Sequence, residues 1–311
     1  MPAITTLKIG TRGSKLALAQ SGWIKGEIVA RYPDVQVELV LIKTKGDKVL
    51  DSPLSKIGGK GLFVKEIEEA LIKKDVDLAV HSIKDVPAEL PAGLWLPVFP
   101  KREDPRDAFL SLDYNSIADL PKGATIGTGS LRRSSQLLHL RPDINIVPLR
   151  GNVDTRLKRL ESGDVQAIML AAAGLKRLGL SDKIRQLLPP EEFLPAIGQG
   201  ALGLELRQDD ERLLDLLGFL NNVPTELTIK AERALLKKLE GGCQVPIAGH
   251  GRLEGDHIIL DGMVAELDGS VIIRDELKGA MDQTEETGIG LAEKLLSSGA
   301  DKILARIYGR E

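Results

Sequence analysis

LKIGTRGSKLALAQSGWIKGEIVAR, residues 7–31, predicts a short apolar strand at 7–11 followed by an amphipathic helix from Ser14 to about Arg31. Ser14 is expected to cap this helix, because a serine side chain can accept a hydrogen bond from an amide of the first turn. A second strand is predicted at 35–42, and it is followed by the helix LFVKEIEEALIKK and the strand VDLAVHS. Strands that alternate with helices predict an α/β fold with a mostly parallel sheet.

The same alternation restarts after the Pro- and charge-rich stretch FPKREDPRD. Strands are predicted in ATIGT, INIVPLR and VQAIML, with helices in SLRRSSQLLHL and VDTRLKRLES between them. A further strand, ALGLELR, follows the Pro-containing segment LLPPEEFLPAIGQG, and we expect it to return to the first lobe. Two crossings of the chain between the lobes would form a hinge beside a cleft.

The pattern changes from Asn222 onward. It predicts a helix at 224–240, strands near 247–254, 257–266 and 271–278, a helix near 285–298 and a final strand KILARIY. The pair Asp268-Gly269 predicts a hairpin turn. We therefore expect three domains: an α/β domain of residues 1–100 with 200–220, a second α/β domain of 105–195, and a small α+β domain with an antiparallel sheet at 222–311.

Composition limits the classes of protein to consider. The chain has 311 residues, 42% hydrophobic and 28% charged, which is typical of a globular protein. The start MPAITTLKIG lacks the features of a signal peptide, and no apolar run is long enough to cross a bilayer, so we expect a cytoplasmic protein. The net charge of -3 argues against a general nucleic-acid binder, but residues 121–160 carry +6. That excess indicates either an anionic ligand or a solvated basic helix face.

Polar and charged residues follow several predicted strands, where the ligands of open α/β sheets bind. The segments are TRGS at 11–14, HSIKDVP at 81–87, GTGSLRR at 127–133 and RGN at 150–152. Basic groups at several separate points suit a ligand with several carboxylates better than one compact phosphate. The GTG stretch lacks the third glycine of a dinucleotide fingerprint, since Arg132 stands there. No zinc-type histidine cluster is present, so no metal is expected.

Three residues have a structural and a chemical interpretation. Asp85 could pair with Lys84 or cap a turn, which the loop alone favours, or it could stabilise a developing cation and move protons. His81 could be catalytic, but it is expected instead to pack near its strand end as a structural residue. Cys243, the single cysteine, follows two glycines, and it is equally consistent with a buried thiol and with an accessible, reactive one.

Seven segments together resemble those of porphobilinogen deaminases, also called hydroxymethylbilane synthases. They are TRGSKLALAQ, GGKGLFVKEIE, HSIKDVP, IGTGSLRRS, LRGNVDTRL, PAIGQGALGLE and ERALLKKLEGGCQVPIAGH. The resemblance spans essentially the whole chain in order, and HSIKDVP together with ERALLKKLEGGCQVPI is highly specific. It implies two lobes like those of periplasmic solute-binding proteins around a cleft, and a third lobe that carries the cysteine loop.

The resemblance implies a transferase of haem and other tetrapyrrole biosynthesis, EC 2.5.1.61. Cys243 would hold one dipyrromethane cofactor per chain through a thioether. Four porphobilinogen molecules would be joined head to tail on it with loss of ammonia, and water would release 1-hydroxymethylbilane. Asp85 would be catalytic, because its carboxylate can stabilise positive charge on pyrrole nitrogens and help to move protons.

Each pyrrole carries an acetate and a propionate, so the resemblance implies many carboxylate-binding residues. Those implied for the cofactor, besides Cys243, are Ser82, Lys84, Thr128, Ser130, Arg132, Arg133, Arg150 and Arg156. Those implied for the substrate are Arg12, Ser14, Gln199, Arg150 and Arg156. The active-site loop over the cleft would contain Lys56, Lys60 and Phe63, and Phe63 could stack on a pyrrole. Two residues depart from the family pattern without removing a charged contact: Gly129, where many members have Ser, and Ser134, where many have Gln.

The resemblance also implies a monomer and leaves open whether product passes directly to uroporphyrinogen III synthase. Neither nucleic acid nor a membrane is an expected partner. The strongest alternative is a two-lobed solute receptor that closes on an anionic ligand without reacting, and it would need neither Cys243 nor Asp85 nor the third lobe. A nucleic-acid binder is a more distant alternative, because only 3% of the residues are aromatic and could stack on bases.

Overall fold

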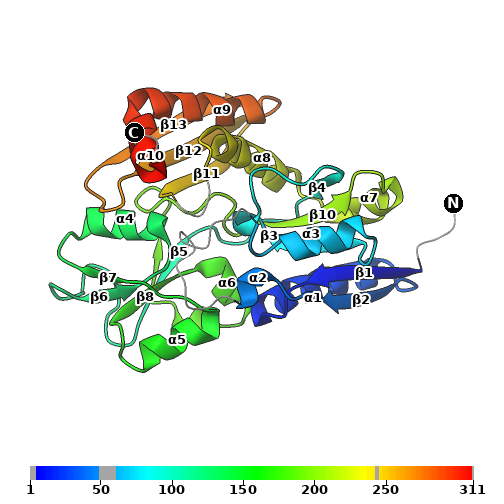
Figure 1. Cartoon of the computed structure of the whole chain (residues 1–311), viewed down its shortest axis with the longest axis horizontal. Coiled ribbons are helices and arrows are strands. Elements are labelled where there is room, and N and C mark those ends of the chain that lie inside the picture. Colours follow the sequence, from blue (N-terminus) through cyan, green and yellow to red (C-terminus); the bar gives the residue numbers. More distant parts are fainter. Residues whose placement is uncertain (1–4, 49–60, 242–244, 310–311) are drawn as a thin grey trace. The chain divides into compact units, whose positions relative to one another are not determined.

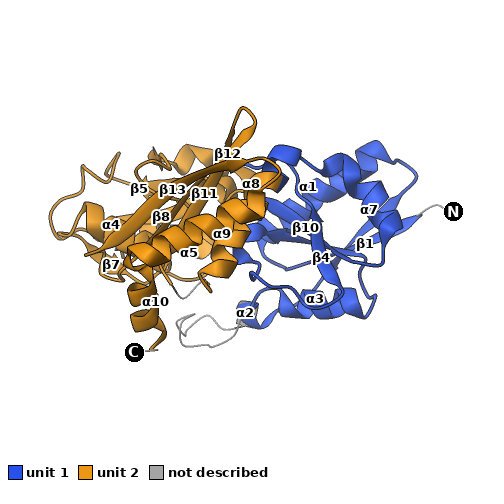
Figure 2. Ribbon diagram, turned by 90° about the horizontal axis from the view of Figure 1, so that it is seen from above, with its two compact units in different colours: residues 1–52, 58–103, 201–226 blue, residues 53–57, 104–200, 227–311 orange. Residues whose placement is uncertain are grey.

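The computed structural model describes residues 5–48, 61–241 and 245–309, and for 47 and 48 it describes the backbone alone. The chain divides into two compact units (Figure 2). The first contains the described residues of Met1–Ser52, Gly58–Glu103 and Ala201–Glu226, and the second those of Asp104–Gly200 and Leu227–Glu311. The return of the chain to the first unit near residue 201 is therefore confirmed, whereas the finer division into three domains stays a prediction.

The first unit is built on a five-stranded mixed sheet in the order β2-β1-β3-β10-β4 (Figure 1). Its strands are β1 (Thr6–Thr11), β2 (Gln36–Leu41), β3 (Leu78–Ser82), β4 (Leu94–Val98) and β10 (Leu202–Arg207). The predicted parallel pairing holds for β1 with β2 and with β3. The returning strand β10 runs antiparallel to β3 and β4, so the sheet is mixed.

Helices cover both faces of this sheet. Helix α1 (Lys15–Arg31) buries Ile24 and Ile28 in the same apolar cluster as Leu7. Ser14 caps this helix as predicted, because its Oγ accepts a hydrogen bond from the backbone amide of Ala17 at 3.2 Å. Helix α3 (Lys65–Ile72) packs on the other face, where Ile67 contributes to a second cluster. The shorter helices are α2 (Lys45–Lys48), the 3₁₀ turn η1 (Ile83–Asp85), α7 (Glu211–Leu217) and η3 (Gly218–Leu220).

The second unit contains another five-stranded mixed sheet, in the order β7-β6-β8-β5-β9. Its strands are β5 (Asp107–Ser111), β6 (Thr125–Gly127), β7 (Asn145–Val147), β8 (Ala167–Ala171) and β9 (Gln186–Leu188). Strand β6 is parallel to β7 and β8, while β5 is antiparallel to β8 and β9. The associated helices are α4 (Leu131–Leu140), α5 (Val153–Glu161), α6 (Ala172–Arg177) and the turn η2 (Ser181–Lys183).

The same unit holds a three-stranded antiparallel sheet of β11 (Ile247–Glu254), β12 (His257–Ala265) and β13 (Ile272–Ala280), as predicted. The turn at Asp268-Gly269 is confirmed, and Gly269 has a φ of 73° that glycine adopts without strain. Helices α8 (Val223–Lys238), α9 (Thr284–Leu295) and α10 (Asp301–Tyr308) accompany the sheet, with a π-helical segment η4 (Leu296–Ala300) joining the last two.

The predicted final strand KILARIY is wrong, because this segment forms helix α10. Ile303, Ala305 and Ile307 alternate as in a strand, which suggested the extended form. Ile303 and Leu304 also recur with Ile307 and Tyr308 at helical spacing, and all four pack into one apolar cluster of the unit. Burial of that face therefore favours the helix. Among the helices of the described ranges, none is long and apolar enough to span a bilayer.

Candidate active site

A pocket of the first unit lies where β1 leads into α1 and β3 into η1. It is lined by five of the predicted site residues, namely Arg12, Ser14, Phe63, Ser82 and Asp85. Lys84 lies in η1 between the last two and is half-buried. Strand ends and a helix N-terminus meet here, as the sheet geometry predicts for a ligand site.

The contacts inside this pocket orient its polar groups. The guanidinium carbon of Arg12 lies 4.3 Å from the ring centroid of Phe63, which is a cation–π contact. The side-chain amide nitrogen Nε2 of Gln20 donates a hydrogen bond to Ser82 Oγ at 2.9 Å. An arginine held over an aromatic ring, beside the first amides of α1, can bind a carboxylate and pack against a flat ring at the same time.

Asp85 ends η1 and is exposed in this pocket. In the described structure its carboxylate forms no hydrogen bond and no ion pair, so neither the pair with Lys84 nor a capping bond is present. His81 differs, because it is buried and its Nε2 lies 2.9 Å from a carboxylate oxygen of buried Glu205. Asp85 is thus a carboxylate placed at a pocket and left available to a ligand.

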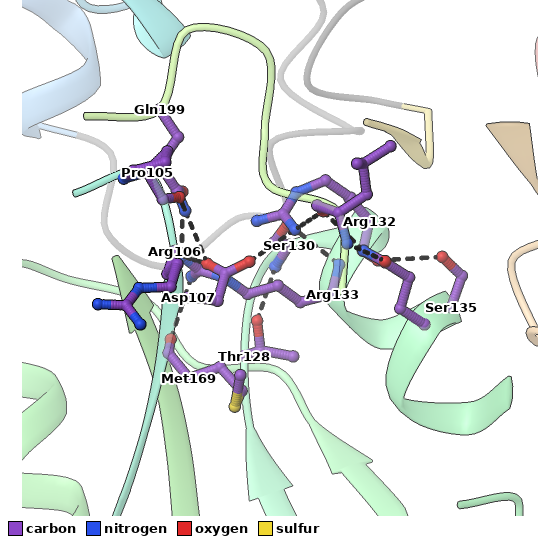
Figure 3. Close-up of polar contacts among 12 residues, drawn as sticks. Pro105, Arg106, Asp107, Thr128, Ser130, Arg132, Arg133, Ser135, Met169 and Gln199 are labelled. Carbon is purple, nitrogen blue, oxygen red and sulfur yellow. Dashed lines mark hydrogen bonds and ion pairs between the residues drawn. The ribbon is translucent and has the colours of Figure 1, made fainter. Parts of the chain in front are cut away.

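The second unit brings three other predicted residues together around Asp107 (Figure 3). Arg132 Nη1 donates to Asp107 Oδ2 at 2.7 Å, and Arg133 Nε donates to Oδ1 at 2.9 Å. Gln199 Nε2 donates to the same Oδ1 at 3.0 Å. Backbone carbonyls complete the network, since Leu194 accepts from Arg132 and Met169 from Arg133.

The charges of this cluster do not balance. Arg132, Arg133 and Asp107 have side chains that are 4%, 6% and 0% exposed, so two cations share one buried anion. Burial alone would raise the pKa of Asp107, but the charges of both arginines hold it well below its usual range. Nε of Arg132 is buried without a hydrogen-bond partner in the described structure. A net charge of +1 and an unsatisfied donor fit an added carboxylate.

The remaining predicted residues surround the N-termini of α4 and α5. Thr128 Oγ1 accepts the amide of Ser130 at 3.2 Å, and Ser130 Oγ caps α4 by accepting the amide of Arg133. Arg156 Nε donates to the carbonyl of Gly151 at 2.9 Å. Arg150 is half-buried beyond β7. Lys56, Lys60 and Cys243 lie outside the described residues.

The two departures from the family pattern lie at the start of α4. A Cβ on Gly129 would lie 2.8 Å from the carbonyl oxygen of Leu149, so this backbone favours glycine there. Ser134 Oγ donates to the carbonyl of Ser130 at 3.1 Å within the helix. Neither change touches the charged groups around Asp107.

Asp107 is the important residue of this site that sequence reasoning missed. It lies in the stretch read as a charge-rich connection, yet it begins strand β5. Two features of the sequence could have indicated it: an acidic residue directly before the apolar run AFL, and two adjacent arginines later in the chain that would need a counter-charge. The described residues form no cluster of three or more His, Cys, Asp or Glu that could hold a metal ion.

Comparisons with known proteins agree with the motifs. Residues 7–215 match the family model "Porphobilinogen deaminase, dipyromethane cofactor binding domain", and residues 226–297 match "Porphobilinogen deaminase, C-terminal domain". The porphobilinogen deaminase of Geobacter metallireducens is 55% identical over 98% of this chain and 96% of its own length. That of Nitratidesulfovibrio vulgaris is 56% identical over 97% of each.

Among solved structures, the methionine-binding protein MetQ matches 70% of this chain and 89% of its own with a TM-score of 0.46 and 15% identity. The family models and the relatives cover nearly all of the sequence, including both described clusters of site residues. The chain belongs to the porphobilinogen deaminase family.

Proposed function

We propose that this chain joins four porphobilinogen molecules head to tail with loss of ammonia and releases 1-hydroxymethylbilane, as a transferase of tetrapyrrole biosynthesis. The family membership over almost the whole sequence is the observation that carries this function. The dipyrromethane cofactor, when bound, supplies the primer to which the substrate units are attached. We assign its thioether anchor to Cys243, the single cysteine of the chain.

The buried cluster around Asp107 fits the acetate and propionate groups of the cofactor. Its uncompensated positive charge and the unsatisfied Nε of Arg132 favour an anion beside α4. Ser130, Arg132 and Arg133 lie at the N-terminus of that helix, where a carboxylate is further stabilised. In this proposal Thr128, Lys84, Ser82, Arg150 and Arg156 bind other carboxylates of the cofactor.

Asp85 is the proposed catalytic residue. When the carbon–nitrogen bond of the protonated aminomethyl group of porphobilinogen breaks, the electron pair leaves with ammonia and positive charge spreads over the pyrrole. A carboxylate beside the pyrrole N–H stabilises that charge. Formation of the carbon–carbon bond then frees a proton, which the same carboxylate can accept and pass to water. The exposed, unpaired state of Asp85 in the pocket supports both tasks.

The substrate's own carboxylates are assigned to Arg12, Ser14 and Gln199, together with Arg150 and Arg156. Arg12 is placed by its contact with Phe63, and the ring can stack on a pyrrole. Lys56 and Lys60 complete the proposed active-site loop. The chain is further proposed to act in the cytoplasm as a monomer, with transfer of the product to uroporphyrinogen III synthase as its next step.

Incubation of the purified chain with porphobilinogen tests the function directly. The proposal expects four ammonia molecules for each 1-hydroxymethylbilane released. The alternative of a solute receptor expects binding of porphobilinogen with no release of ammonia. Substrate that stays intact over many hours, with a folded and cofactor-loaded chain, contradicts the proposed function.

A further inference from the structure

Three buried titratable side chains lie close enough for their charges to interact on the α3 face of the first sheet, behind the pocket of Asp85. They are Glu68 of α3, His81 of β3 and Glu205 of β10, and they are 6%, 5% and 0% exposed. Antiparallel pairing places Glu205 opposite Ala79 and Gly203 opposite His81, so the side chains of His81 and Glu205 project from the same face. His81 Nε2 and Glu205 Oε2 lie 2.9 Å apart.

The charges of this group restrict its protonation. If His81 is protonated and Glu205 is ionised, a second ionised carboxylate would leave a buried net charge of -1. The other oxygen of Glu205 is buried without a hydrogen-bond partner in the described structure. A protonated Glu68 avoids the extra charge, because a neutral carboxyl group is much less costly to bury than an ionised one.

Charged groups on the neighbouring strands do not change this account. Strands β1, β3 and β10 pack against α3. Besides His81 and Glu205 they carry Lys8, which is exposed, and Arg207, which donates to the carbonyls of Leu71 and Val76. Burial and the charge of Glu205 raise the pKa of Glu68 to about 7, while His81 lowers it. Glu68 is therefore expected to change its protonation state near neutral pH.

His81 connects this group to the pocket, because it also lines the wall next to Ser82 and Asp85. We propose that Glu68, His81 and Glu205 form a buried proton-holding group, in which a neutral Glu68 prevents a second negative charge, in addition to that of Asp85, beside the pocket. Glu68 is then a positioning residue that acts on the anionic substrate through His81. This inference rests on the proposed function, since it takes porphobilinogen, with its two carboxylates, as the ligand of the pocket.

Glu68→Gln tests the inference, because glutamine keeps the shape and cannot ionise. We expect the KM of the wild-type chain for porphobilinogen to rise between pH 6.5 and pH 8.5 as Glu68 loses its proton. In Glu68→Gln the KM stays near its low-pH value, and at pH 8.5 it lies about three- to tenfold below that of wild type. Glu69→Gln is the matched control, because Glu69 is the exposed neighbour on the same helix, and its profile follows wild type.

Two results overturn the inference. One is a pH profile of KM in Glu68→Gln that coincides with that of wild type, and the other is a decrease in kcat that is the same at every pH. A second measurement does not depend on turnover. Carbon-13 NMR of labelled glutamate carboxyl groups should show one resonance that titrates near pH 7 and is missing in Glu68→Gln. A carboxyl of Glu68 that titrates below pH 6 contradicts the proton-holding group even if the chain turns over porphobilinogen. Conversely, a chain that titrates as expected but releases no ammonia contradicts only the function.

Discussion

Substitution of Asp107 by asparagine should strongly destabilise the second unit. Asp107 is fully buried and faces Arg132 at 2.7 Å and Arg133 at 2.9 Å. Asparagine retains the shape but places an amide donor against guanidinium donors, and it leaves two buried cations without a counter-charge. Removal of one partner from a buried ion pair costs about 3–5 kcal/mol, and we expect the free energy of unfolding to fall by that amount.

The partly exposed pair of Arg141 and Asp143 supplies the matched control. It has a similar distance of 2.7 Å, but its side chains are 21% and 32% exposed, compared with 4% and 0% for Arg132 and Asp107. Solvent screens such pairs, so Asp143→Asn should leave the unfolding midpoint almost unchanged. The difference between the two variants isolates the effect of burial.

Urea unfolding followed by two probes measures the effect. Both tryptophans, Trp23 and Trp95, lie in the first unit, so their fluorescence reports that unit, while far-ultraviolet circular dichroism reports both. Asp107→Asn should lower the dichroism midpoint, with a smaller shift in fluorescence if the units unfold separately. The folded pKa of Asp107 is depressed, so its stabilisation is present above its unfolded pKa of about 4 and is lost on acidification below it. A decrease in the free energy of unfolding no larger than that of Asp143→Asn would contradict the expected effect of burial.

Two further predictions concern the pocket and the hairpin. Asp85→Ala should keep the unfolding midpoint within error yet nearly abolish ammonia release, because the pocket loses its unpaired carboxylate; near-normal release would remove Asp85 from its role. Gly269→Ala should lower the free energy of unfolding by about 1–2 kcal/mol because of its φ of 73°. It should cost about 1–3 kcal/mol more because the added Cβ would contact Ser135 and lie 2.7 Å from the His139 backbone nitrogen. Gly255→Ala has a φ of 60° in open space and should show only the backbone part; equal losses in thermal unfolding would contradict the steric part.

Local patterns in the sequence predicted the elements that depend on neighbouring residues. Ser14 could be assigned as a cap because the capping bond spans three residues, and Asp268-Gly269 as a turn because its geometry is local. The return of β10 was predictable from an apolar strand left over after the second lobe. Such signals do not depend on the order of strands in a sheet.

The missed features depend on contacts between distant parts of the chain. Asp107 meets Arg132 and Arg133 only because β5 lies beside β8, which in turn lies beside β6 at the start of α4. Glu205 likewise reaches His81 only because β10 runs antiparallel to β3. The segment of α10 fits the periodicities of both a strand and a helix, and burial of Ile303, Leu304, Ile307 and Tyr308 in one apolar cluster decided between them. Motif resemblance, by contrast, supplied the predicted roles of Arg12, Asp85 and Cys243.

In the proposed function, a dipyrromethane attached to Cys243 primes the assembly of the tetrapyrrole. The mass of the denatured, purified chain tests it most directly, because only a covalent cofactor survives denaturation. We expect an excess over the sequence mass that corresponds to a dipyrromethane. In Cys243→Ser both this excess and the release of ammonia should be lost. An unmodified mass from chains that turn over porphobilinogen, or an unchanged excess in Cys243→Ser, would contradict it.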